Sequence, residues 1–237
     1  AHNNLGNTLS ELDKLDEAIA SYKQAIKLKP DYAEAHNNLG NTLSELGKLD
    51  KAEACYKRAI ALQPDHAEAH SNLGLTLQEL GELDEAIASY EKAIALQPDD
   101  ALAHCNLGMA LREIGRLEEA EASYARALAL EPENAKVHNN LGHMLKKLGR
   151  VDEAEASYTR ALAIEPDNAD VLFNKSYLSF DKGDYETALK YADACNSKSV
   201  DALPLMALYA LGRVSEVYER LEVQYKTDEK DLNVAAF

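Results

Sequence analysis

The 237-residue sequence has no tryptophan, only three cysteines and no apolar run near the ~18 residues that span a bilayer. Basic residues are also few, because 25 lysines and arginines stand against 41 aspartates and glutamates, a formal net charge of −16. Nucleic acid and anionic membranes both attract basic surfaces, so we expect neither as a partner. Three widely separated cysteines predict no disulfide framework and fit a reducing compartment such as the cytoplasm: Cys55, Cys105 and Cys195. No signal peptide is recognised.

The dominant feature of the sequence is a repeat with a period of 34 residues. It governs a proline column (Pro30, Pro64, Pro98, Pro132 and Pro166), two glycine columns (Gly6, Gly40, Gly74, Gly108 and Gly142; Gly47, Gly81, Gly115, Gly149 and Gly183) and a tyrosine column (Tyr22, Tyr56, Tyr90, Tyr124 and Tyr158). A period of this length indicates a solenoid of stacked units.

Each unit reads as two helices. In the second unit, Leu39, Leu43 and Leu46 share one helical face, and Gly47 suits the end of that helix. Pro64 then ends a second helix, whose apolar face comprises Leu49, Ala52, Tyr56, Ala59 and Ile60. One such pair cannot bury its own apolar face, so the units must stack to stabilise one another.

The second unit reads AEAHNNLGNTLSELGKLDKAEACYKRAIALQPDH, and its glycine, alanine, aromatic and proline columns resemble the tetratricopeptide repeat (TPR) family. The resemblance implies an all-α, right-handed superhelical solenoid of six units, 1–32, 33–66, 67–100, 101–134, 135–168 and 169–202. Two features depart from the family pattern. Histidine replaces an early aromatic residue of the first helix (His2, His36, His70, His104 and His138), and the last unit is degenerate at Ser176, Ala192 and Val200.

The period breaks after residue 202. We expect residues 203–226 to form a shortened, TPR-like terminal unit and residues 228–237 to begin another helix, so that 203–237 leads into a further region. The apolar end Val234–Phe237 is unlike the polar cap of a solenoid. Because the chain starts inside a repeat, we interpret it as a fragment.

Catalytic and metal-binding motifs are not found. The sequence has no HExxH, CxxC or GxSxG motif. Histidines on successive units stand ~10 Å apart, whereas metal ligands must meet within ~2.1 Å of one ion. We therefore expect no enzyme activity, no cofactor and no metal, and we interpret the histidines as fillers of the aromatic slot.

Asparagine forms the most informative column. It stands two residues before the first glycine column in all six units, although it is a mediocre helix former: Asn4, Asn38, Asn72, Asn106, Asn140 and Asn174. On the first helix of the second unit, Asn38 and Asn41 lie in one stripe with Glu34 and Glu45, and in TPR solenoids the first helices line the concave surface. A carboxamide offers both a donor and an acceptor, so this stripe could bind a peptide backbone.

The HNNLGN block is similar to the repeats of O-linked N-acetylglucosamine transferases, in which a ladder of asparagines holds the backbone of extended substrates. This resemblance implies that the six asparagines bind peptide and that the chain is the substrate-recruiting arm of a larger enzyme. Two alternatives stay open. Each asparagine could instead bond to the adjacent unit and stiffen the solenoid, or duplication could simply have copied it.

Charge along the expected groove is uneven. Glutamate fills one column in four units (Glu11, Glu45, Glu79 and Glu113), and Lys147 follows in the fifth, near Lys136 and Lys146. A solvated surface is the ordinary interpretation. The sharper hypothesis places a basic partner segment over units one to four and an acidic segment over unit five, with Lys146 and Lys147 in the site.

These observations predict a non-catalytic module that binds an extended peptide or protein segment in a concave groove. The alternative function is a structural scaffold that self-associates, either end to end or through its convex face.

Overall fold

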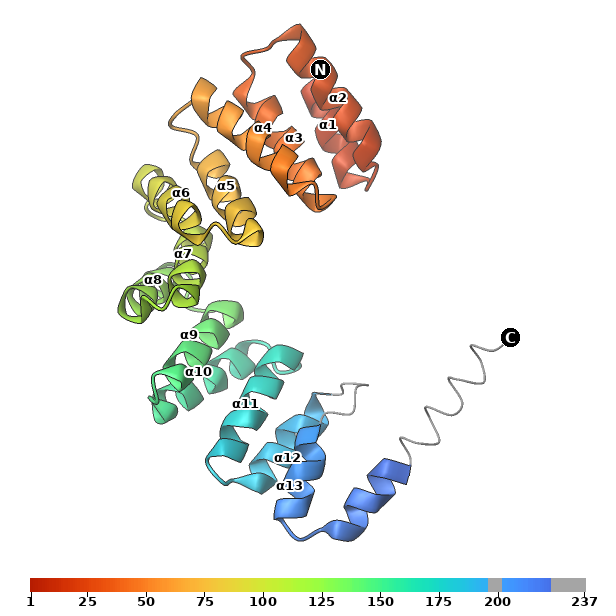
Figure 1. Cartoon of the computed structure of the whole chain (residues 1–237), viewed down its shortest axis with the longest axis vertical. Coiled ribbons are helices and arrows are strands. Elements are labelled where there is room, and N and C mark those ends of the chain that lie inside the picture. Colours follow the sequence, from red (N-terminus) through yellow and green to blue (C-terminus); the bar gives the residue numbers. More distant parts are fainter. Residues whose placement is uncertain (196–201, 223–237) are drawn as a thin grey trace, which may run out of the picture. The chain divides into compact units, whose positions relative to one another are not determined.

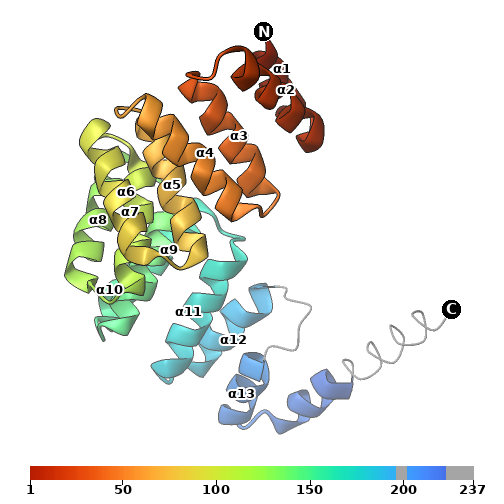
Figure 2. The same ribbon diagram turned by 45° about the horizontal axis from the view of Figure 1, so that its top comes forward.

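The structure is a computed structural model that describes residues 1–195 and 202–222. These residues are helical and contain no β-strand (Figures 1 and 2). They fall into two compact units, unit 1 (1–132) and unit 2 (from residue 133), which are described separately. None of the described helices is both long and apolar enough to span a membrane.

Unit 1 consists of four helical hairpins. Their first helices are α1 (His2–Glu11), α3 (Ala33–Glu45), α5 (Ala67–Leu80) and α7 (Ala101–Glu113). Their second helices are α2 (Leu15–Leu28), α4 (Leu49–Leu62), α6 (Leu83–Leu96) and α8 (Leu117–Leu130). Each hairpin corresponds to one sequence repeat, as the 34-residue period predicts.

The glycine and tyrosine columns meet inside each hairpin. A methyl group built on Gly40 would lie 2.6 Å from the Tyr56 ring, and one on Gly74 would lie 2.7 Å from the Tyr90 ring. Only glycine therefore lets the tyrosine ring cross its helix so closely. The second glycine column ends the first helices, and Gly81, for example, has the left-handed φ of +83° that terminates α5.

Successive hairpins of unit 1 stack through their first helices. The helix α3 packs against both α1 and α2, α5 against α3 and α4, and α7 against α5 and α6. The second helices of neighbouring hairpins make no comparable contacts within residues 1–132. The first helices are therefore the closer-spaced layer, which makes theirs the concave face of unit 1.

Unit 2 continues with the same hairpins. It comprises α9 (Ala135–Lys147), α10 (Val151–Ile164), α11 (Ala169–Asp181), α12 (Tyr185–Ala194) and α13 (Ala202–Ala210), and residues 214–222 are also helical. In the degenerate repeat, the Ser176 hydroxyl donates to the carbonyl of Ala188 at 2.6 Å, where other repeats place tyrosine against glycine.

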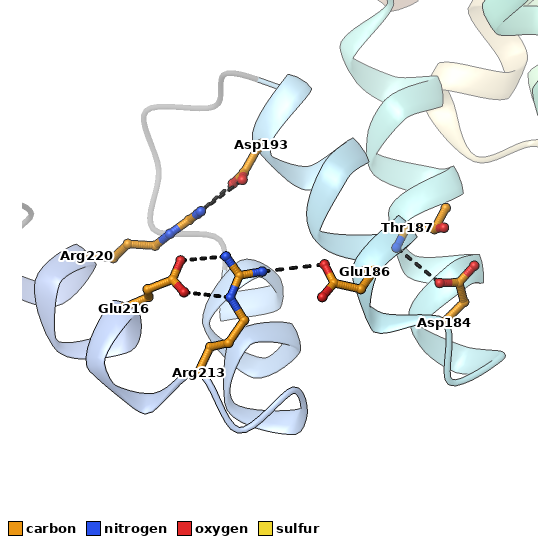
Figure 3. A network of polar contacts seen from close by, with 7 residues as sticks. All are labelled: Asp184, Glu186, Thr187, Asp193, Arg213, Glu216 and Arg220. Carbon is orange, nitrogen blue, oxygen red and sulfur yellow. Dashed lines mark hydrogen bonds and ion pairs between the residues drawn. The ribbon is translucent and has the colours of Figure 1, made fainter.

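The terminal helices keep several repeat features. Arg213 follows the left-handed Gly212 and forms a two-bond pair with Glu216, as Arg116 does with Glu119 after Gly115. Figure 3 shows this pair together with the Arg220–Asp193 pair, whose two bonds measure 2.6 and 2.9 Å. These contacts favour the proposal that a shortened repeat begins at residue 203. Residues 196–201 and 223–237, including the helix expected at 228–237, lie outside the described residues.

Candidate peptide-binding groove

A cleft of about 340 Å³ opens on the concave face of unit 1. It is lined mainly by α1 and α3, with Tyr22 of α2 as an additional wall: Asn7, Ser10, Glu11, Tyr22, Asn38, Asn41, Thr42 and Glu45. Asn38, Asn41 and Glu45 thus share one face of α3 and lie in the same cleft.

Hydrogen bonds fix the carboxamides in this cleft. The Asn7 Oδ1 accepts from the Tyr22 hydroxyl at 2.9 Å and from the Asn38 Nδ2 at 3.0 Å. The same Asn38 Nδ2 also donates to the Asn3 Oδ1 at 3.2 Å. Both amides are therefore oriented by the fold.

The next junction, between α3 and α5, repeats this arrangement. The Asn41 Oδ1 accepts from the Tyr56 hydroxyl at 2.8 Å and from the Asn72 Nδ2 at 2.9 Å, and that Nδ2 also reaches the Asn37 Oδ1 at 3.2 Å. Two kinds of group have no partner among the described residues: the Nδ2 donors of Asn7 and Asn41, and the Oδ1 acceptors of Asn38 and Asn72.

Two further residues at each junction support the network. The Nδ2 groups of Asn3 and Asn37 donate to Glu34 and Glu68 of the following repeat, both at 3.0 Å. Asn3, Asn7, Asn37 and Glu68 were not predicted from the sequence as parts of this network. The sequence does carry a signal for the asparagines. Asn7 and Asn3 lie 31 and 35 residues before Asn38, close to one period of 34, and two asparagines precede Asn72 at the same separations.

The remaining column members lie in different surroundings. Asn4 is exposed, whereas Asn106 is only 1% exposed and its Nδ2 has no hydrogen-bond partner in the described structure. In unit 2, the Asn174 Nδ2 donates to the Asn139 Oδ1 at 3.0 Å, and Asn140 is half-buried. Bonds between adjacent repeats are thus present at Asn38, Asn72 and Asn174, as the stiffening interpretation expects.

The cleft is electrostatically negative. Burial is the main cause that raises the pKa of Tyr22, and the carboxylates of Glu45 and Glu11 raise it further. Burial likewise raises the pKa of Tyr90, with Glu113 and Glu79 adding to the effect. No ion pair to Glu11, Glu45 or Glu79 is found in residues 1–132, so these charges are not neutralised within unit 1.

The lysines proposed from sequence lie on α9 in unit 2. The Lys146 Nζ pairs with the Asp181 Oδ2 at 2.7 Å and lies 5.9 Å from the centre of the Tyr177 ring. Lys147 is exposed. The charge of Lys146 is therefore already engaged by a neighbouring helix.

Three members of the histidine column contact the turn that precedes their helices α3, α5 and α7. The Nε2 atoms of His36, His70 and His104 lie 3.2, 3.0 and 3.0 Å from the carbonyl oxygens of Pro30, Pro64 and Pro98. Burial lowers the pKa of His36. In the described part of the chain, no group of three or more histidine, cysteine, aspartate or glutamate side chains is arranged to hold a metal ion.

Solved structures share this fold. MamA is 27% identical over 69% of this chain and 96% of its own, with a TM-score of 0.64. YrrB, described as a TPR protein with an unusual peptide-binding site, is 25% identical over 81% of this chain and 97% of its own, with a TM-score of 0.64. The pilus biogenesis factor PilW is 23% identical over 87% of this chain and 96% of its own, with a TM-score of 0.79. A comparison with curated protein sequences gives no significant match.

The family comparison covers all six repeats, since the match runs over residues 1–202. Solenoids of this class present extended concave surfaces that bind other proteins, and the helical hairpins described above form such a surface in unit 1. The chain belongs to the tetratricopeptide repeat family described as the cilia and flagella-associated protein 70 C-terminal domain.

Proposed function

We propose that unit 1 is a non-catalytic module that holds an extended peptide or protein segment in its concave groove. The observation that carries this proposal is the alternation of unpartnered amide groups along the groove. Asn7 and Asn41 present Nδ2 donors, and Asn38 and Asn72 present Oδ1 acceptors. An extended backbone offers carbonyl and N–H groups in the same alternation.

Stiffening and binding are compatible in this arrangement. The bonds between repeats use the Oδ1 of Asn7 and Asn41 and the Nδ2 of Asn38 and Asn72. The opposite end of each amide remains for a ligand. Because the side chains are already held in place, the groove is preorganised and less conformational entropy is lost on binding.

The amides alone give weak binding. Four neutral hydrogen-bonding sites at about 1 kcal/mol each contribute about 4 kcal/mol, which corresponds to a dissociation constant of about 1 mM. Specific binding therefore needs side-chain contacts in addition to backbone pairing. The sequence suggests further binding residues in each unit taken by itself: Asn4 and Asn106 in unit 1, and Asn140, Asn174, Lys146 and Lys147 in unit 2.

The finer proposal concerns the larger protein. The resemblance of HNNLGN to transferase repeats supports a role as the substrate-recruiting arm of a modifying enzyme such as a glycosyltransferase. Peptide binding by YrrB, which has a similar fold, supports the coarser proposal of peptide recognition.

The test replaces donors without touching the internal bonds. In the double variant Asn7→Asp and Asn41→Asp, the carboxylate still accepts from tyrosine and from the following asparagine, but the Nδ2 donor is gone. We expect affinity for uncharged extended peptides, measured by fluorescence anisotropy at high salt, to fall several-fold while the melting temperature stays near that of the parent.

Asn134→Asp is the matched control, because it adds the same kind of charge at the N-cap of α9, where Oδ1 accepts from the Val137 N–H. It should leave affinity unchanged. Unaltered peptide binding by the double variant would refute the proposed pairing, and a loss of stability without loss of binding would assign the amides to stiffening alone.

Self-association is the second candidate, and exposed apolar side chains favour it. Leu12 and Leu28 are exposed in the first hairpin, as are Met206, Tyr209 and Tyr218 in the terminal helices. Light scattering over a concentration series tests it. Assembly that Leu12→Ser and Leu28→Ser abolish would support a scaffold, whereas a monomer at all concentrations would exclude one.

A further inference from the structure

Three positions change together between the second and third junctions of unit 1. At the α3–α5 junction, Asn37, Asn41 and Glu68 form the polar network with Asn72. One repeat later, at the α5–α7 junction, the corresponding positions hold Ser71, Leu75 and Leu102. Two aliphatic residues have thus replaced an amide and a carboxylate on the concave side.

The two leucines at these positions are not fully buried in the core. Leu102 is 57% exposed, and Leu75 is half-buried. In the next repeat, Met109 occupies the position of Asn41 and is also half-buried. We name Leu75, Leu102 and Met109 the aliphatic patch. An exposed leucine in a column that otherwise carries charge presents apolar surface that a partner could cover.

Two polar groups beside the aliphatic patch are left without partners. The buried Asn106 Nδ2 at this junction has no hydrogen bond within the described structure, and neither has the buried Tyr124 hydroxyl of the α7–α8 hairpin, where Met109 stands in place of Asn41. A buried unsatisfied donor costs free energy, so the aliphatic patch is retained at a cost to the fold. Such a cost is expected where a residue serves binding.

Aliphatic side chains separate this junction from the first cleft, because both carry glutamates of the same column. At the α1–α3 junction, Glu11 and Glu45 line the cleft and no cationic side chain of unit 1 pairs with them. At the α5–α7 junction the corresponding glutamates remain, and the aliphatic patch is added. A partner that fills both places must complement carboxylates at the first and, at the second, aliphatic side chains as well.

Building on the proposed function, we infer that the bound segment is bipartite, with lysines or arginines over the α1–α3 cleft and one large aliphatic side chain over the aliphatic patch. The two places are two repeats apart. First helices pack at 8–10 Å, and an extended chain advances ~3.3 Å per residue, so the two parts of the ligand should be separated by about six residues.

The test uses four labelled synthetic peptides and the full chain. The first carries an Arg-Lys stretch with a leucine six residues away, and the second replaces that leucine with serine. The third replaces the basic residues with glutamine, and the fourth moves the leucine to within two residues of the basic stretch. In the parent protein, we expect the first peptide to bind about tenfold more tightly than the second or the fourth, as burial of one leucine side chain allows.

Two variants test the two parts of the site separately. Leu75→Asn with Leu102→Glu gives the third junction two of the three residues that distinguish the second, and the same fold already accommodates them at Asn41 and Glu68. This variant should bind the first and second peptides equally. Glu11→Gln with Glu45→Gln should weaken both peptides alike, keep the ratio between them and reduce the salt dependence of binding.

Separate outcomes distinguish the two proposals. If none of the four peptides binds, the proposed function fails together with the bipartite ligand. If all four bind with equal affinity, the proposed function stands and the bipartite ligand is refuted. Should the Leu75 and Leu102 variant fail to fold, which circular dichroism would show, the ratio between the first and second peptides in the parent still decides.

Discussion

The two junctions on either side of α5 differ in their polar layer of hydrogen bonds and agree in the packing layer beneath it. At α3–α5, carboxamides and tyrosine form a continuous set of hydrogen bonds. At α5–α7, the equivalent Asn106 Nδ2 is buried without a partner, and the equivalent Tyr90 hydroxyl donates to the Gln78 Oε1 at 3.1 Å instead of to a carboxamide of the column. The glycine–tyrosine packing beneath is the same at both. The comparison shows that packing holds the repeats together, while the polar layer above can vary and can therefore acquire function.

The largest effect should come from the shared packing layer. In Gly74→Ala, the new methyl group would meet the buried Tyr90 ring at 2.7 Å, so the free energy of unfolding should fall by about 1–3 kcal/mol. Gly40→Ala should cost a similar amount, because Tyr56 lies equally close. Urea denaturation followed by circular dichroism measures both.

A second substitution isolates the cause of that loss. With Tyr90→Ala present, Gly74→Ala should cost much less, as in the degenerate repeat, where Ser176 and Ala192 replace glycine and tyrosine together. A full loss in the Tyr90→Ala background would show that the clash does not explain the glycine column.

The polar layer should respond differently at the two junctions. Asn72→Ala removes two hydrogen bonds and leaves the buried Asn37 oxygen without a donor, so it should destabilise by about 1–2 kcal/mol. Asn106→Ala removes an unsatisfied donor and adds a better helix former, and these gains offset the packing that the buried side chain loses, so its effect should be near zero. Equal losses from the two substitutions would contradict the contrast between the junctions.

Leu75→Asn sharpens this contrast by supplying the acceptor that Asn41 supplies to Asn72. In that background, Asn106→Ala should become costly, with a coupling free energy of about 1 kcal/mol between the two positions. A double-mutant cycle in urea measures the coupling, and its absence would mean that the position of Leu75 does not reach Asn106.

The fold was predictable because the residues that determine the packing recur at the same positions in several repeats. Gly74 and Tyr90 recur in register, and the fixed period predicts both helices of every hairpin. The asparagine column was also visible. What its amides bond to was not, because those bonds join columns 31 and 35 residues apart and depend on side-chain geometry across two helices.

Differences between repeats also held structural information that was not predicted from the sequence. The change from Asn37 to Ser71 reads as drift in a single column. The structure shows that it coincides with the changes to Leu75 and Leu102, since all three positions surround one amide network in the preceding junction. Only the contacts between repeats reveal that these substitutions belong together.

The smallest effect should come from the tyrosine hydroxyls. Tyr56→Phe removes a 2.8 Å bond to the Asn41 Oδ1 and should cost about 1 kcal/mol. Tyr124→Phe removes a buried hydroxyl that has no partner, so the free energy of unfolding should stay the same or rise. Both rings keep their packing against glycine, so the difference between the two variants reports the hydroxyl alone. If Tyr124→Phe were as costly as Tyr56→Phe, the Tyr124 hydroxyl would have a partner in solution, and the replacement of Asn41 by Met109 would not change the polar layer of its hairpin after all.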